Sequence, residues 1–156
     1  PYDRPTTAEG WRAFGRELAG FQAKLKQHGI RLAWHNHAFE FERAECHYPL
    51  DLIFEGAPDL LWETDIGWVT RAGQSAAKWI EKYRDRIVAL HVKDIAPEGE
   101  NEDQDGWTDV GAGVIDWQAL RPALDGEKVE LLVLEHDNPA DFGQFVRRSR
   151  EAIAAW

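Results

Sequence analysis

The chain contains four short apolar runs, and each of them ends on a side chain that can ligate a metal ion. They are Ile30-Arg31-Leu32-Ala33-Trp34-His35, Leu60-Leu61-Trp62-Glu63-Thr64-Asp65, Ile87-Val88-Ala89-Leu90-His91 and Val129-Glu130-Leu131-Leu132-Val133-Leu134-Glu135. Runs of this kind are typical of buried strands in a parallel sheet, and α/β folds place ligands and catalysis at the C-terminal ends of such strands. The pattern therefore predicts an α/β enzyme.

Length, composition and charge favour a globular protein with a small ligand. The 156 residues match one domain, 1–156, and 44% of them are hydrophobic. The net charge of −10 argues against nucleic acid as the main partner. No apolar run approaches the roughly 20 residues that cross a bilayer, so no membrane contact is expected. The single Cys46 excludes an internal disulfide, and we expect a cytoplasmic protein.

Helical periodicity alternates with the four apolar runs. Apolar residues spaced by three and four predict a helix over about 7–28, with Thr7 as its N-cap and Gly29 after its last turn. Further helices are expected after Pro49, near 74–83, after the glycine-rich turn 110–116, and over 140–155. This alternation predicts parallel βαβ units. Four strands are too few for an eight-stranded barrel, so the chain is either half of a barrel with two open edges or a small open sheet. The missing initiator methionine is consistent with a trimmed or omitted N-terminal part.

The four strand-end residues His35, Asp65, His91 and Glu135 are the candidate metal ligands. Converging at one edge of the sheet, they would form a divalent-metal site or a cluster of acids and bases. Asp65 could instead serve a turn, His91 could be a hydrogen-bonded core histidine, and His35 could cap a turn. Glu135 follows a fully apolar run, where a buried carboxylate needs a cation or hydrogen-bond donors, so a functional role is favoured.

Other residues near the strand ends extend this cluster. Lys93 could stabilise an oxyanion or simply pair with Asp94. Tryptophan faces suit sugar rings, although packing in the core is an equal alternative for Trp62. The turn Gly111-Ala112-Gly113 is only weak evidence for a phosphate loop. No serine or cysteine lies in a nucleophile context. The tryptophans on or next to the strand ends are Trp34, Trp62, Trp68 and Trp107.

At these residues the chain resembles the xylose isomerase-like TIM-barrel superfamily, in its sugar phosphate isomerase/epimerase branch. The matching stretches, in the family's order, are Trp34-His35-Asn36-His37-Ala38-Phe39-Glu40-Phe41, Glu63-Thr64-Asp65-Ile66-Gly67-Trp68-Val69, Leu90-His91-Val92-Lys93-Asp94, Val110-Gly111-Ala112-Gly113-Val114-Ile115-Asp116-Trp117 and Leu134-Glu135-His136-Asp137. The resemblance implies that the four strands are strands five to eight of the barrel. The N-terminal half-barrel would then be missing from this chain, and either that half or a second copy of the chain would pair with it.

The resemblance also implies one divalent ion, most often Mn²⁺, with Zn²⁺, Co²⁺ or Mg²⁺ as alternatives. Family members hold it with Glu, Asp, His and Glu at the ends of strands five to eight. Asp65, His91 and Glu135 match these positions, whereas His35 stands where most members have the first glutamate. Related DNA-repair endonucleases have additional metal ligands, but the corresponding places here hold Trp68 and Asp105-Gly106-Trp107. A multinuclear zinc site is therefore not expected.

The leading hypothesis is a metal-dependent sugar or sugar-phosphate isomerase/epimerase that transfers a proton α to a carbonyl through an enediolate. Glu135 would be the base, His35 a ligand or second acid/base, and Lys93 the group that stabilises the enediolate. Because His35 replaces a glutamate, an inosose-type dehydratase on the same site is an alternative. A non-catalytic sugar-binding domain is another. The expected substrate contacts are His37, Lys93, Trp34 and Trp68.

Overall fold

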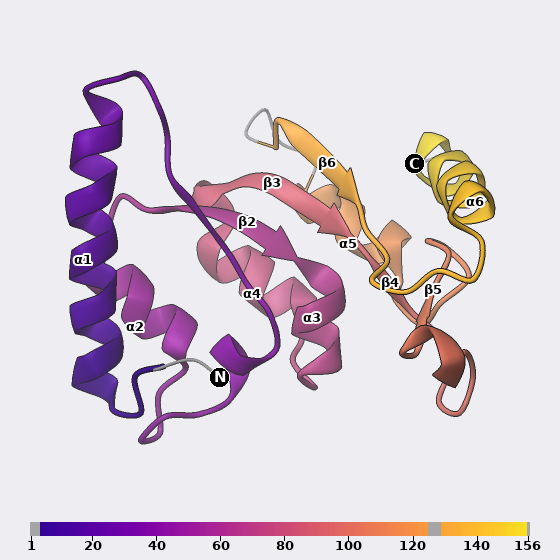
Figure 1. The fold of residues 1–156 in the computed structure, drawn as a ribbon, viewed down its shortest axis with the longest axis horizontal. Coiled ribbons are helices and arrows are strands. Elements are labelled where there is room, and N and C mark those ends of the chain that lie inside the picture. The colour runs from indigo at the N-terminus through magenta and orange to yellow at the C-terminus, as the bar shows by residue number, and fades with distance from the viewer. Residues whose placement is uncertain (1–3, 125–128, 156) are drawn as a thin grey trace.

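The computed structural model describes residues 4–124 and 129–155, and it contains a four-stranded parallel sheet with the order β1-β2-β3-β6 (Figure 1). The strands are β1 (Ala33–His35), β2 (Leu61–Asp65), β3 (Ile87–Val92) and β6 (Leu131–Leu134). A second, two-stranded antiparallel sheet pairs β4 (Asp94–Ile95) with β5 (Trp107–Thr108). The helices are α1 (Ala8–Lys26), α2 (Pro49–Gly56), α3 (Ile66–Arg71), α4 (Ala76–Tyr83), α5 (Trp117–Leu124) and α6 (Phe142–Ala154), with short 3₁₀ turns at Phe39–Phe41, Arg84–Arg86 and Glu102–Gln104.

Local signals place most of these elements where the sequence predicts them. Thr7 caps α1 by accepting a hydrogen bond from the Gly10 amide, and Gly29 follows the helix with a φ of +72°. Helix α2 begins at Pro49. The helix α3 is unexpected, since the sequence predicts only a connection over 66–73. It forms because the Asp65 side chain caps it, accepting from the Trp68 amide.

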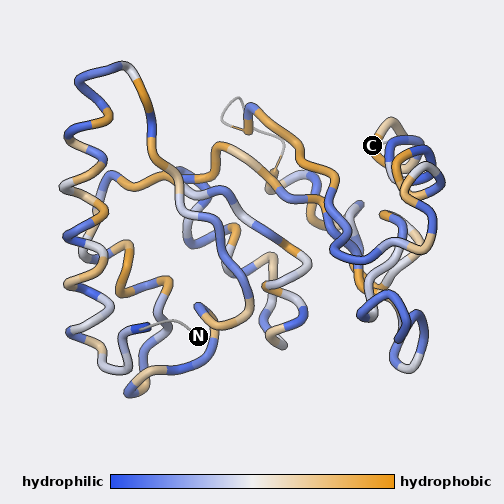
Figure 2. The backbone as a smooth tube through the Cα atoms, in the orientation of Figure 1, coloured by the Kyte–Doolittle hydropathy of each residue, from blue (hydrophilic) through white to orange (hydrophobic). Residues whose placement is uncertain are grey.

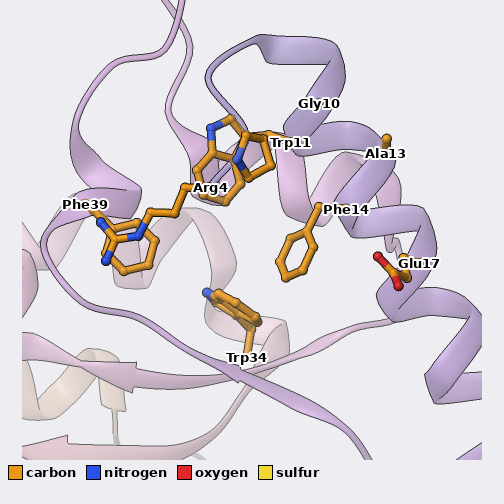
Figure 3. Close-up of a pocket in the computed structure, with 9 residues that line it drawn as sticks. Arg4, Gly10, Trp11, Ala13, Phe14, Glu17, Trp34 and Phe39 are labelled. Carbon is orange, nitrogen blue, oxygen red and sulfur yellow. The ribbon is translucent and has the colours of Figure 1, made fainter. Parts of the chain in front are cut away.

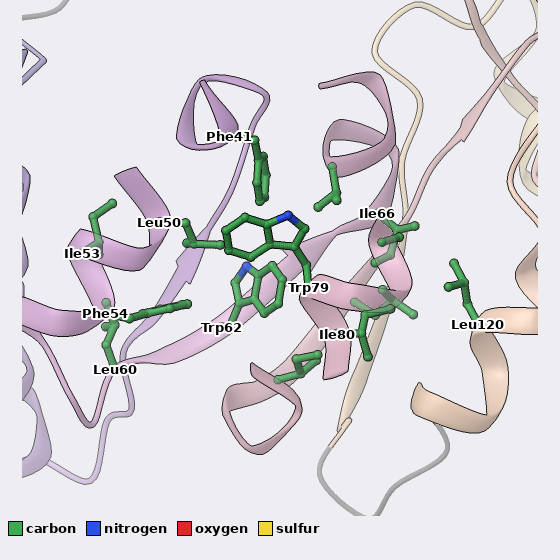
Figure 4. Packing of buried hydrophobic residues seen from close by; sticks show 14 of the residues in the cluster. Phe41, Leu50, Ile53, Phe54, Leu60, Trp62, Ile66, Trp79, Ile80 and Leu120 are labelled. Carbon is green, nitrogen blue, oxygen red and sulfur yellow. The ribbon is translucent and has the colours of Figure 1, made fainter. Parts of the chain in front are cut away.

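The sheet packs one face against helices α2 and α4, and this layer holds the hydrophobic core (Figure 4). Trp62 and Leu90 point into it from the strands, and neither side chain is more than 1% exposed. Hydrophobic colour runs along β3 and β6, while the outer turns of the helices are largely hydrophilic (Figure 2). Trp62 is therefore a core residue, and its indole N–H is satisfied by Asn36 Oδ1 at 2.9 Å.

The chain between β3 and α5 is held together by Asp94, which is fully buried. Its carboxylate accepts hydrogen bonds from the Gly111 and Ile115 amides and from Trp117 Nε1. A Cβ on Gly113 would lie 2.1 Å from Asp94 Oδ1, so only glycine fits there. The glycine-rich turn thus binds an internal carboxylate, which leaves the phosphate-loop interpretation unsupported. The suggested Lys93–Asp94 pair is also wrong, because Lys93 pairs with Glu135 and Asp137 instead.

Both outer strands of the sheet lack a second partner within residues 4–124 and 129–155. Strand β1 pairs only with β2, and β6 pairs only with β3. Leu131 and Leu132 of β6 are accordingly 56% and 43% exposed. The fold is a half-barrel-like arrangement of parallel β/α units, as the half-barrel prediction requires. Within the same residues, no helix combines the length and the apolar character needed to cross a membrane.

Helices α1 and α2 touch through two glycines. A Cβ on Gly15 would lie 2.3 Å from the Ile53 carbonyl oxygen, and a Cβ on Gly56 would lie 2.3 Å from the Arg12 carbonyl oxygen. Both obstacles are backbone atoms, which cannot rotate away. The close approach of these helices beside β1 therefore requires glycine on both sides.

We expect Gly15→Ala to lower the free energy of unfolding by about 1–3 kcal/mol, because the helices must separate to admit the methyl group. Gly20→Ala is the matched control on the same helix, since a Cβ at Gly20 would meet no atom of the described residues within 4 Å. The control should raise stability by about 0.5–1 kcal/mol through helix propensity. Urea denaturation of both variants measures the difference, and equal effects would contradict the contact.

Candidate metal centre

The four predicted ligands meet at the C-terminal edge of the parallel sheet. Their candidate ligand atoms, from His35, Asp65, His91 and Glu135, all lie within 4.8 Å of one another. The sheet register brings this about, since β1 pairs His35 with Glu63 and β2 pairs Asp65 with His91. The Glu135 amide continues the β3–β6 ladder to the Val92 carbonyl oxygen at 3.4 Å. Two imidazoles and two carboxylates are thus presented to one point.

Unpaired polar atoms in the cluster fit a bound cation. His35 Nδ1 and Asp65 Oδ2 are both buried, and neither has a hydrogen-bond partner among the residues that the structure describes. Buried polar atoms are normally paired, so two such acceptor-type atoms in one cluster are what a site for a positive charge requires. Imidazole nitrogen with carboxylate oxygen suits first-row divalent ions.

Burial sets the protonation of the two residues from β1 and β2. Desolvation, with smaller contributions from the neighbouring His91 and His37, lowers the pKa of His35 to about 4. At neutral pH its imidazole is uncharged and keeps a free lone pair, which is the form that binds metal. Desolvation also raises the pKa of Asp65 to about 7, although the Trp68 amide and Lys93 oppose it. A bound cation would stabilise the ionised Asp65 carboxylate and so offset the cost of its desolvation.

His91 and Glu135 form the charged side of the cluster. His91 Nδ1 contacts Glu135 Oε2, and His91 Nε2 lies 2.7 Å from Glu63 Oε1. Burial lowers the pKa of His91, but these two carboxylate contacts outweigh it and leave the pKa raised. The hydrogen bond from His91, helped by Lys93, holds the pKa of Glu135 well below its usual range against the effect of burial. Glu135 is therefore an ionised carboxylate at neutral pH.

Lys93 lies against this cluster and is completely buried. Its Nζ donates to Glu135 Oε1 at 3.0 Å and to Asp137 Oδ1 at 2.6 Å. It also sits 4.2 Å from the centroid of the Trp107 ring and 4.9 Å from that of Trp68. Two carboxylates and two aromatic faces hold the ammonium group beside the strand ends.

The predicted substrate contacts divide into two groups. The His37 ring lies 4.8 Å from the His35 ring and 5.5 Å from the Trp68 ring, so His37 and Trp68 border the cluster. They also line an open pocket of about 530 Å³. Trp34, in contrast, lies on the opposite face of β1 from His35. It packs against Phe14 of α1 and lines a separate hollow of about 430 Å³ with Arg4 and Phe39 (Figure 3).

Four polar residues at the site have no role predicted from the sequence. Asn36 donates to the Asp65 carbonyl oxygen and accepts from the Asp65 amide at 3.0 Å, which holds the ends of β1 and β2 together. The buried Glu40 accepts from the His37 amide and from Trp34 Nε1, and burial raises its pKa to about 7. Glu63 and Asp137 bind His91 and Lys93, respectively. Of these four residues, only Glu63 could have been assigned to the site from the sequence, because it lies two residues before Asp65 and so faces the same side of β2.

Comparison with curated proteins gives relatives among the inosose dehydratases. No protein-family model matches the chain. Inosose dehydratases from two strains of Clostridium perfringens, ATCC 13124 and 13, are 28% and 27% identical over 148 residues, or 85% of this chain. The chain spans about half the length of these relatives, 49% of each.

Solved structures show the same architecture. A sugar phosphate isomerase/epimerase from Parabacteroides distasonis superposes with a TM-score of 0.81 at 19% identity, covering 99% of this chain and 55% of its own. A probable 3-DHS dehydratase from Bacillus anthracis gives 0.74 at 10% identity, with 94% and 57% covered. A xylose isomerase domain protein from Alicyclobacillus acidocaldarius gives 0.67 at 18% identity, with 93% and 57% covered. The chain therefore has the xylose isomerase-like TIM-barrel fold, over about half of the barrel.

Proposed function

We propose that this chain forms the metal-binding half of an isomerase or epimerase that acts on a sugar or sugar phosphate. The observation that carries the proposal is the convergence of His35, Asp65, His91 and Glu135 within 4.8 Å, next to the buried Lys93. A divalent ion held there would polarise a substrate carbonyl and its neighbouring hydroxyl, which acidifies the adjacent C–H bond. We propose Mn²⁺ as the ion and a cytoplasmic location for the protein.

Each side chain at the site would have its own role in proton transfer. Glu135 is ionised, so it can accept the proton α to the carbonyl. Lys93 Nζ, 3.0 Å from Glu135 Oε1, places a positive charge where negative charge develops on the enediolate oxygens. His37 and Trp68, which border the cluster, would contact the sugar. The lowered pKa of His35 leaves its imidazole neutral at pH 7 with a lone pair available to a metal ion, and we assign His35 as a ligand.

A dehydratase on the same site is the second candidate. Two observations favour it: the curated relatives are inosose dehydratases, and His35 replaces the glutamate that would serve the second face of the substrate. Removal of the α-proton by Glu135 would give the same enediolate. Loss of a β-hydroxyl with a proton then releases water and leaves an unsaturated ketone. A sugar-binding domain without catalysis is distinguished from both enzymes by metal content, since it need not bind a divalent ion stoichiometrically.

Removing the base should abolish proton transfer. We expect Glu135→Gln to lower the rate of deuterium uptake from D₂O into recovered substrate by about 10²- to 10⁴-fold, because an amide cannot accept the proton. Inosose and a panel of ketohexoses are the test substrates, with Mn²⁺ added. Mass spectrometry separates exchange or epimerisation from loss of water.

Glu81→Gln is the matched control, because Glu81 is exposed on α4, away from the strand ends. It should retain the full rate. Undiminished deuterium uptake in Glu135→Gln would contradict the proposal. So would a wild-type protein that binds no divalent ion and exchanges no substrate proton.

Metal affinity should depend on pH through Asp65. Its pKa of about 7 means that the carboxyl is mostly protonated at pH 6 and mostly ionised at pH 8. Because the ligand must lose its proton, we expect Mn²⁺ affinity to fall by roughly tenfold from pH 8 to pH 6 from this group alone. His91, whose pKa is raised, adds to the fall in the same direction. Calorimetry in buffers of different ionisation enthalpy should detect proton release on binding at pH 6, and a pH-independent affinity without proton release would contradict the assignment.

A further inference from the structure

The His91 imidazole is held between two carboxylates from two neighbouring strands. Glu63 of β2 lies 2.7 Å from Nε2, and Glu135, just after β6, contacts Nδ1. The His91 side chain is only 12% exposed, so these contacts take up both ring nitrogens in a partly buried place. The ring therefore has little freedom to turn.

The two carboxylates are not equivalent. Glu135 contributes to the four-residue ligand cluster, whereas Glu63 lies outside it. The β2–β3 register pairs Glu63 with Ala89, one step before the Asp65–His91 pair at the strand end. Ala89 has only a methyl side chain, which leaves room for the Glu63 side chain to reach Nε2 of His91. Glu63 thus contacts Nε2 of the His91 ring, and Glu135, which belongs to the ligand cluster, contacts Nδ1.

The chemistry of a neutral imidazole links these contacts to metal binding. Such a ring has one N–H donor and one bare nitrogen, and an ionised carboxylate can only accept. Glu63 at Nε2 and Glu135 at Nδ1 each favour hydrogen on the nitrogen that they contact, so these two contacts alone select neither neutral tautomer. A cation bound by Glu135 would take the Nδ1 lone pair in place of that hydrogen, while Glu63 would keep the hydrogen on Nε2.

We propose that Glu63 is a positioning residue that fixes the His91 ring and its tautomer, so that Nδ1 is the nitrogen presented to the metal. The inference rests on the proposed metal site, but it concerns a residue outside the ligand set. Glu63 would act through His91 without contacting the ion, which separates its role from that of Glu135.

The first test is a titration of the metal-free protein with Mn²⁺ alone, in the wild type, Glu63→Ala, Glu63→Gln and Glu81→Ala. We expect about 10- to 100-fold weaker binding for Glu63→Ala, the usual effect of losing a carboxylate that supports a histidine ligand. Glu63→Gln should be intermediate, since its amide oxygen can still accept from Nε2. Glu81→Ala should match the wild type.

The second test reads the tautomer directly in the protein loaded with diamagnetic Zn²⁺. Nitrogen-15 NMR should show His91 bound through Nδ1 and protonated at Nε2 in the wild type, and a mixture of the two binding modes in Glu63→Ala. The His91→Gln variant assigns the signals. Thermal unfolding of each variant checks that the fold is retained, and Glu63→Gln replaces Glu63→Ala if the latter does not fold.

The outcomes separate this inference from the proposed function. If the wild type binds Mn²⁺ and Glu63→Ala binds it as tightly as the control, the positioning role is wrong while the metal site stands. A Zn²⁺-loaded wild type whose His91 is protonated at Nδ1 also overturns the inference. If the wild type binds no divalent ion, the proposed function fails, and Glu63 could not then be a positioning residue for metal.

Discussion

The parallel register of the four strands is the constraint on which the site depends. Parallel strands end at one edge of a sheet, so one ligand from each strand suffices to build a four-ligand site. The pairing of Asp65 with His91 in the β2–β3 register makes two of these ligands direct neighbours. Asn36 holds the end of β1 against the end of β2, because its side-chain amide forms hydrogen bonds with both the N–H and the C=O of Asp65. A slip of one residue would turn these side chains to the other face of the sheet.

The two faces of β2 and β3 carry different chemistry. Trp62 and Leu90 face the helices and belong to the core, while Asp65 and His91 face the open side of the half-barrel. The alternation keeps the carboxylates out of the apolar layer and groups them where Lys93 and His91 can pair with them. Leu131, in the outer strand β6, is also exposed.

Much of the fold and of the candidate ligand set follows from local patterns. The spacing of apolar residues locates α1, and the ends of the four apolar runs identify His35, Asp65, His91 and Glu135. The sequence groups Trp34 with the site because it lies next to His35, yet adjacent residues on a strand face opposite sides, and Trp34 packs against α1. Glu40 and Asp137 have no role predicted from the sequence because their partners, Trp34 and Lys93, are met only through loops whose paths depend on packing.

The sequence by itself determined the order of β/α units, the strand ends and the residue types that can ligate a metal, because periodicity and side-chain chemistry are local properties. Tertiary structure decided that Glu63 and Glu135 contact the two ring nitrogens of His91, and that Lys93 pairs with Asp137 instead of Asp94. It also set the protonation of His35 and Asp65. These features depend on distances between residues far apart in the chain and on burial, which exist only once the strands are aligned.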